Sequence, residues 1–258
     1  MVDPLMKRNL AQAPGGSSGV RIMADADGRQ YFVKFKENGH FLKALTNEYL
    51  AGKIAERLGL PAPQAHIVYI DPLLVPTLQP INHTPVSDGP HFATCALENV
   101  YAGPFLGSYI ARCVNKSIYP LIILFDALLY NCDRRMQGNF VITTSGNTYT
   151  FNIIDHGFCF GTNWDCEILR TVQGSWSDAY LPEMYATIQD ATDFNNALQL
   201  IAAITDDFFI NLVEQIPEDW LPDKSERKAL IQFLILQRNS ISTMLSANLH
   251  KFPNLLQP

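Results

Sequence analysis

The sequence predicts an α+β fold of two lobes, because its first part has the pattern of a small sheet and its last part that of packed helices. Residues 20–36 contain two β-favouring runs joined by an Asp/Gly turn, and residues 45–58 carry apolar side chains at helical spacing. From residue 190 onward, helical patterns dominate. We therefore expect a small β-rich N-lobe with one main helix and a larger, mostly helical C-lobe.

The N-lobe pattern begins after a Gly/Ser-rich stretch. The main helix should end at Gly59 and Pro61, which are typical helix stop residues, and the five prolines of residues 71–90 predict a loop. The regular elements expected here are strands at 20–24 and 30–36, a helix at 45–58, and strands at 65–70 and 91–97.

The C-lobe pattern starts with a helix whose first turn contains Pro120, where a missing N–H costs little. The elements expected are a helix at 117–130, strands at 140–144 and 148–154, and helices at 194–205, 207–215 and 224–249. We divide the chain into an N-terminal extension at 1–14, an N-lobe at 15–103 and a C-lobe at 104–258.

Composition excludes several classes of protein. The 258 residues are 47% hydrophobic and 17% charged, which rules out a disordered chain, collagen and a coiled coil. The net charge is −6, and no cluster of Lys and Arg is present. Because nucleic acids and anionic membranes attract basic surfaces, we expect no direct binding to either.

The longest apolar run, residues 121–130, is interrupted by Asp126 and is too short to span a bilayer. The N-terminus lacks the apolar segment of a secretory signal. The five cysteines form no CxxC pair and no zinc-like spacing with histidine. We therefore expect a reduced, cytoplasmic protein.

Three features of the first lobe are suited to binding phosphate. The loop Gly15-Gly16-Ser17-Ser18-Gly19 can present backbone N–H groups to an anion, although a flexible linker has the same composition. Lys34 lies in a strand with apolar and aromatic neighbours, and Glu48 on the following helix can hold its ammonium in place. Taken singly, Lys34 can also be an edge-strand lysine and Glu48 a solvated helix residue.

Two features of the second lobe are suited to acid–base and metal chemistry. Asp133 and Asn139 lie in one loop between a buried helix and a hairpin, so Asp133 can accept a hydroxyl proton while Asn139 offers an oxygen to Mg²⁺. Asp155 leaves the second hairpin strand just before Gly157 and can be a charged Mg²⁺ ligand. An Asx-rich helix cap and an ordinary turn are the simpler explanations.

The order of these features is that of a protein-kinase-like phosphotransferase: glycine loop, strand lysine, helix glutamate, Asp…Asn loop, hairpin and Asp-x-Gly. Over residues 15–247 the chain resembles the HipA-like kinase family, whose catalytic half is similar to phosphoinositide 3/4-kinases. The matching stretches are GGSSGVRIMADADGRQYFVKFK, LTNEYLAGKIAERLGLPAP, FDALLYNCDRRMQGNF, NIIDHGFCF and IPEDWL with the helix after it.

The resemblance implies ATP and Mg²⁺ as cofactors, a protein substrate phosphorylated on Ser or Thr, and an antitoxin-like or other regulatory protein as a possible partner. It also implies roles for the individual residues: Gly15 to Gly19 as the phosphate loop, Lys34 as the phosphate-binding lysine, Glu48 as its partner, Asp133 as the catalytic aspartate, and Asn139 and Asp155 as metal ligands. A loop serine, Ser17 or Ser18, would be a site of inhibitory autophosphorylation.

The sequence departs from the family pattern in the catalytic loop. Asn139 follows Asp133 by six positions, where kinase-like loops usually have five, and Arg135 stands where the family often has His. Two other classes therefore stay open. One is a nucleotide-binding pseudokinase or interaction module, and the other is a metal-dependent hydrolase that would use Asp133, Asp155 and His156.

Overall fold

The computed structural model of the chain describes residues 3–13, 19–38, 43–81, 83–103, 107–136, 138–161, 163–177 and 180–255. Its N-terminal part is a six-stranded sheet of order β1-β5-β6-β4-β3-β2. All neighbouring strands are antiparallel except β1 and β5. The strands are β1 (Leu5–Met6), β2 (Arg8–Gln12), β3 (Arg21–Ala24), β4 (Gln30–Lys34), β5 (Ala65–Ile70) and β6 (His91–Cys95).

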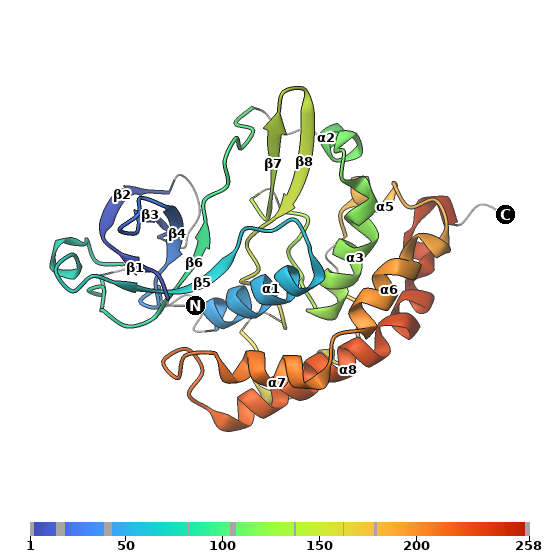
Figure 1. Cartoon of the computed structure of the whole chain (residues 1–258). Helices are drawn as coiled ribbons and strands as arrows, with labels where there is room; N and C mark the ends of the chain where they lie inside the picture. The colour runs from blue at the N-terminus through green and yellow to red at the C-terminus, as the bar shows by residue number, and fades with distance from the viewer. Residues whose placement is uncertain are drawn as a thin grey trace.

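Helix α1 (Ala44–Leu58) covers one side of this sheet and lies between the sheet and the C-terminal helices (Figure 1). It ends at Gly59, whose φ of 68° is the left-handed conformation that glycine adopts without a steric penalty. Gly52 lets α1 approach β5 closely, because an added Cβ there would lie 2.4 Å from the Cβ of Ala65. This close contact sets the position of α1 over β5.

The second half of the chain contains a hairpin of strands β7 (Phe140–Ser145) and β8 (Thr148–Ile153). The connection from the sheet to the helical part runs along this hairpin. The amide of Tyr101 donates to the carbonyl of Ile142 at 2.8 Å, and that of Thr144 donates to Asn99 at 2.9 Å.

The helical part packs around α3 (Tyr119–Leu128), in which all ten residues are buried. Such uniform burial explains why its sequence is apolar on every face. The other helices are α2 (Ser108–Arg112), α4 (Cys166–Val172), α5 (Pro182–Tyr185), α6 (Asn195–Ala202), α7 (Asp206–Glu214) and α8 (Lys224–Asn248), with short 3-10 helices at Val75–Thr77, Lys116–Ile118, Ala191–Phe194, Leu249–Lys251 and Pro253–Leu255. The long helix α8 contacts α3, α4, α6 and α7 (Figure 1).

The expected strands and the long helices all form, with end points shifted by a few residues. The sequence patterns missed β1 and β2, which add to both edges of the sheet from the stretch assigned to an N-terminal extension. They also missed the short helices α2, α4 and α5. These elements have only two to seven residues, too few to show a clear periodicity.

No single helix within the described ranges is long and apolar enough to cross a membrane. Only the bent pair Ala191–Ala202 and Asp206–Glu214, with 61° between its parts, meets the length and composition criterion when both parts are counted together. Both parts contribute buried side chains to the core, among them Ile201 and Phe209.

Candidate active site

Three predicted site residues meet in a single ionic cluster. Lys34 at the end of β4 donates to Glu48 on α1, and its Nζ also lies 2.9 Å from Oδ1 of Asp155, 121 residues away along the chain. The side chain of Glu48 is 2% exposed, that of Lys34 18% and that of Asp155 41%. The lysine therefore connects a buried carboxylate to one that reaches solvent.

Burial and charge set the protonation of this cluster. Although burial favours the neutral amine, the carboxylates of Glu48 and Asp155 raise the pKa of Lys34. Burial likewise opposes ionisation of Asp155, but the Lys34 ammonium and hydrogen bonds lower its pKa to about 2. Burial raises the pKa of Glu48 to about 7 against the opposing effect of Lys34. Lys34 is thus a fixed cation and Asp155 a fixed anion at neutral pH, as phosphate and metal binding require.

Asp133 and Asn139 also lie in contact, despite the extra residue between them. The side-chain amide of Asn139 donates to the backbone carbonyl of Asp133 at 2.5 Å and to its carboxylate Oδ2 at 2.8 Å. Asn131 holds the other side of the loop, because its Oδ1 accepts from the amide of Asp133 at 3.1 Å. With its amide nitrogen committed to Asp133, Asn139 keeps its carbonyl oxygen as the group that can bind a hard metal ion.

Arg134 connects the loop of Asp133 and Asn139 to the backbone next to Asp155. It is completely buried and makes a two-pronged ion pair with Asp126, with both N···O distances at 3.0 Å. Its other N–H groups reach the carbonyl of Asn139, the carbonyl of Ile154 at 3.1 Å and the ring Nδ1 of His156 at 3.2 Å. One buried guanidinium therefore fixes the backbone next to both proposed metal ligands.

The backbone around Asp155 is held from both sides. Asp155 has a φ of 54°, a left-handed conformation that is uncommon for a residue other than glycine. On its C-terminal side, the amide of His156 donates to Oε2 of Glu48 at 3.0 Å, and Asn47 donates to the carbonyl of Gly157 at 2.8 Å. Two adjacent α1 side chains thus hold the turn that presents Asp155.

The structure brings together five of the ten predicted site residues, in two clusters. Lys34, Glu48 and Asp155 form one cluster, and Asp133 and Asn139 form another, while Arg134 links the two through the backbone. Of the predicted phosphate loop, Gly15, Gly16, Ser17 and Ser18 lie outside the described residues. Gly19 is described, with a φ of 59°.

The sequence patterns did not identify Asn47, Asp126 and Trp164 as parts of the site. A signal existed for Asp126, since it is the one charged residue in the longest apolar run, and a charge at such a position needs a buried partner. Asn47 lies between Thr46 and Glu48, and these three buried polar residues interrupt the apolar pattern of α1.

The donor set suits a metal held partly by nucleotide phosphates. Among the described residues no group of three or more His, Cys, Asp and Glu side chains can hold a metal ion. Asp155 and Asn139 could each offer an oxygen ligand, which is the chemistry and number typical of Mg²⁺ bound together with phosphates. His156 is 4% exposed and its Nδ1 faces Arg134, so it does not supply the third protein ligand of a hydrolase-type site.

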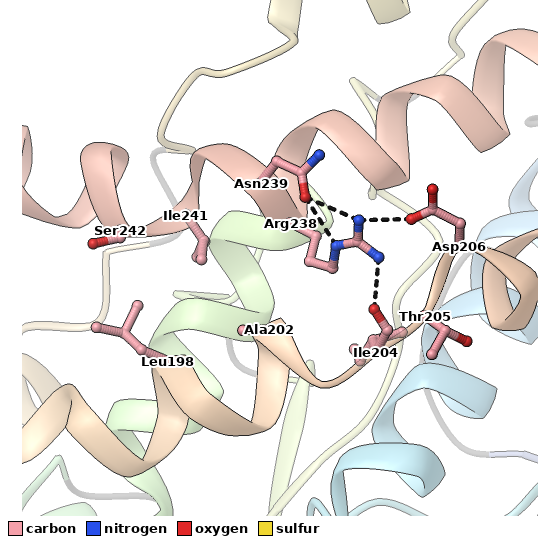
Figure 2. A pocket seen from close by; sticks show the side chains of 9 residues that line it. All are labelled: Leu198, Ala202, Ile204, Thr205, Asp206, Arg238, Asn239, Ile241 and Ser242. Carbon is pink, nitrogen blue, oxygen red and sulfur yellow. Dashed lines mark hydrogen bonds and ion pairs between the residues drawn. The ribbon is translucent and has the colours of Figure 1, made fainter.

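A surface cavity of about 510 Å³ lies apart from these residues, among α6, α7 and α8 (Figure 2). Arg238 at this cavity pairs with Asp206 at 2.6 Å and donates to the carbonyl of Ile204 at 2.6 Å, so its charge is already compensated. None of the cavity's lining residues is a predicted site residue.

Comparisons with solved structures support the same fold. The chain is similar to the Helicobacter pylori proinflammatory kinase CtkA, with a TM-score of 0.62 and 14% identity over 96% of each chain. It is also similar to Shewanella oneidensis HipA, solved with HipB and operator DNA, with a TM-score of 0.52 and 11% identity over 93% of this chain and 67% of that one.

The Golgi casein kinase with Mn and ADP bound gives a TM-score of 0.55 at 12% identity, over 98% of this chain and 74% of that one. These likenesses confirm the predicted α+β, protein-kinase-like fold. No curated protein sequence matches the chain significantly. The model of the HipA-like kinase family matches residues 7–252, almost the whole length. With a kinase-like fold and a family match of this extent, the chain belongs to the HipA-like kinases, a family of phosphotransferases.

Proposed function

We propose that this kinase uses ATP and Mg²⁺ to phosphorylate Ser or Thr side chains of a protein. The observation that carries the proposal is the meeting of Lys34, Glu48 and Asp155 from three distant segments, which places an ammonium between a buried carboxylate and one that reaches solvent. Phosphoryl transfer needs positioning and charge neutralisation, and this cluster is suited to both.

Each residue of the proposed site has a distinct task. Lys34 binds phosphate oxygens of ATP, and Glu48 holds the ammonium in place. Asp155 and the carbonyl oxygen of Asn139 hold Mg²⁺, which neutralises charge on the phosphates. Asp133 accepts the proton of the attacking hydroxyl, and its Oδ2 is oriented for this by the amide of Asn139.

The Lys34 ammonium lies 2.9 Å from Oδ1 of Asp155. Since a cation at this carboxylate occupies the position proposed for the metal, we infer that Lys34 moves from Asp155 toward phosphate when nucleotide and metal bind. The pair with Glu48 limits this movement, because Glu48 is buried on α1.

The proposal has two consequences outside the site. An antitoxin-like protein is the proposed regulatory partner, by analogy with the Shewanella HipA structure, which contains HipB. The net charge of −6 argues that any DNA in such an assembly would be contacted by the partner. The cysteine positions in the sequence include no CxxC motif and no zinc-like spacing with histidine, which favours a cytoplasmic location.

Thermal shift and radiolabelled ATP together test the proposal. ATP with Mg²⁺ should raise the melting temperature more than Mg²⁺ alone, and casein should take up labelled phosphate on Ser or Thr. Asp155→Asn should abolish Mg²⁺-dependent nucleotide binding. Asp133→Ala should leave binding intact while turnover falls by roughly 10²–10⁴.

Three outcomes would separate the alternatives. Stabilisation by ATP and Mg²⁺ without any turnover would make the protein a pseudokinase. Stabilisation by the metal alone would favour a hydrolase. Equal losses of nucleotide binding in both variants would contradict the separate roles of Asp133 and Asp155.

A further inference from the structure

Asn47 occupies a central place in the contact between α1 and the segment that follows Asp155. Its side chain is completely buried and donates from Nδ2 to the carbonyls of Gly157 at 2.8 Å and Cys159 at 3.1 Å. Its Oδ1 accepts from the indole N–H of Trp164 at 2.8 Å. One side chain of α1 therefore binds three points of the segment 157–164.

The position of Trp164 does not depend on Asn47 alone. Its ring is 1% exposed, and the ammonium of Lys43 lies 4.2 Å from the ring centroid, a cation–π contact. Lys43 also donates to the backbone carbonyl of Trp164 and to Glu226 on α8. Lys43 therefore holds Trp164 next to α8 independently of the hydrogen bond to Asn47.

Trp164 determines which way the Asn47 amide points. An indole N–H can only donate, so it must face the carbonyl oxygen of Asn47. The NH₂ group is then directed at the two carbonyls of the segment, which can only accept. All three hydrogen bonds are buried, where an unmade bond is costly.

These bonds act on Asp155 through its neighbours. A left-handed backbone such as that of Asp155 persists only when its surroundings hold it. Arg134 holds the carbonyl of Ile154 before it, and Asn47 holds the carbonyl of Gly157 after it. On the same side, the His156 amide bond to Glu48 and the contact of the His156 ring with Arg134 also restrain the turn.

We propose that Asn47, oriented by Trp164, is a positioning residue that holds Asp155 in its metal-binding conformation. The inference rests on the proposed function, in which Asp155 is a metal ligand. It adds that the segment after Asp155 is kept in place by a buried amide and an indole, so that metal binding depends on a tryptophan that is not one of the proposed metal ligands.

Trp164→Phe tests the inference, because it keeps an aromatic ring and removes the N–H. The matched control is Trp220→Phe: Trp220 is 4% exposed and its N–H donates to the carbonyl of Pro90 at 2.9 Å, so the same bond is lost elsewhere. Both variants should lose a similar amount of thermal stability. That loss does not report on the site, so the deciding measurement is nucleotide affinity.

Affinity for a non-hydrolysable ATP analogue is measured by calorimetry with and without Mg²⁺. In Trp164→Phe the affinity with Mg²⁺ should weaken by about three- to tenfold, the range for one disturbed buried hydrogen bond, while affinity without Mg²⁺ stays unchanged. Trp220→Phe should match the wild type in both. Asn47→Asp, which keeps the acceptor for Trp164 and removes both donors, should show the same Mg²⁺-specific loss with a larger size.

Two results would overturn the inference while leaving the proposed function in place. One is an unchanged Mg²⁺-dependent affinity in Trp164→Phe and Asn47→Asp. The other is an equal loss with and without Mg²⁺, which would show a general disturbance of the site. Failure of the wild-type protein to bind the analogue with Mg²⁺ would instead remove the proposed function itself.

Discussion

The buried ion pair between Arg134 and Asp126 should contribute strongly to stability. Asp126 is 4% exposed and Arg134 is fully buried, so Asp126→Asn leaves an uncompensated guanidinium in the core. Removing one member of such a pair costs about 3–5 kcal/mol. Asp126 also accepts from the side chain of Asn131 at 2.7 Å, and this bond is disturbed by the same change. We therefore expect Asp126→Asn to lower the free energy of unfolding by about 3–5 kcal/mol.

Urea denaturation followed by tryptophan fluorescence measures this loss. Asp219→Asn is the matched control, because Asp219 is 52% exposed and pairs with Lys36 at 2.6 Å. An exposed pair of this kind contributes less than about 1 kcal/mol. The double variant Asp126→Asn/Arg134→Gln should be less destabilised than the two single losses added together. If Asp126→Asn costs no more than Asp219→Asn, the reasoning about the buried pair is wrong.

Three further predictions concern the cluster around Lys34 and the contact between α1 and β5. Glu48→Gln should lower the rate of phosphoryl transfer by about 10- to 100-fold, because Lys34 is left paired with Asp155; a rate equal to the wild type would contradict this. Asp155 should contribute stability above its ordinary pKa of 3.8 that is lost as the pH falls toward about 2. Solvent screening limits this to about 1 kcal/mol, and melting curves of the wild type and Asp155→Asn from pH 5 to 2 should converge. Gly52→Ala should destabilise by about 1 kcal/mol in thermal unfolding, since the clash with Ala65 outweighs the gain in helix propensity; a stabilised variant would show that α1 can shift.

The local elements of this protein were predictable because their signals lie among neighbours in the chain. The helical spacing of apolar residues before Gly59 predicted α1 nearly to the residue, and the Asp/Gly turn predicted the β3–β4 hairpin. Strand β1 was missed because it has only two residues, and β2 because all five of its side chains are exposed and carry no alternating pattern. Both strands add to free edges of the sheet.

In the candidate site, too, some features were predictable from the sequence and others appeared only in the structure. The sequence order of Lys34, Glu48, Asp133, Asn139 and Asp155 predicted them as site residues, and the structure shows contacts among them. The six-residue spacing of Asp133 and Asn139 remained ambiguous until the structure showed the amide of Asn139 bonded to Asp133 at two points. A loop can absorb one extra residue without moving its ends, and spacing alone does not report this.

By itself, the sequence determined the longer helices, six of the eight strands and the kinase-like order of motifs. Only the tertiary structure decided that Arg134 links the two loops and that Asn47 and Trp164 hold the segment after Asp155. The physical reason is that helix and strand patterns arise from neighbours a few residues apart. The partners of the buried Asn47 come from a segment more than a hundred residues away, and they are fixed by how the whole core packs.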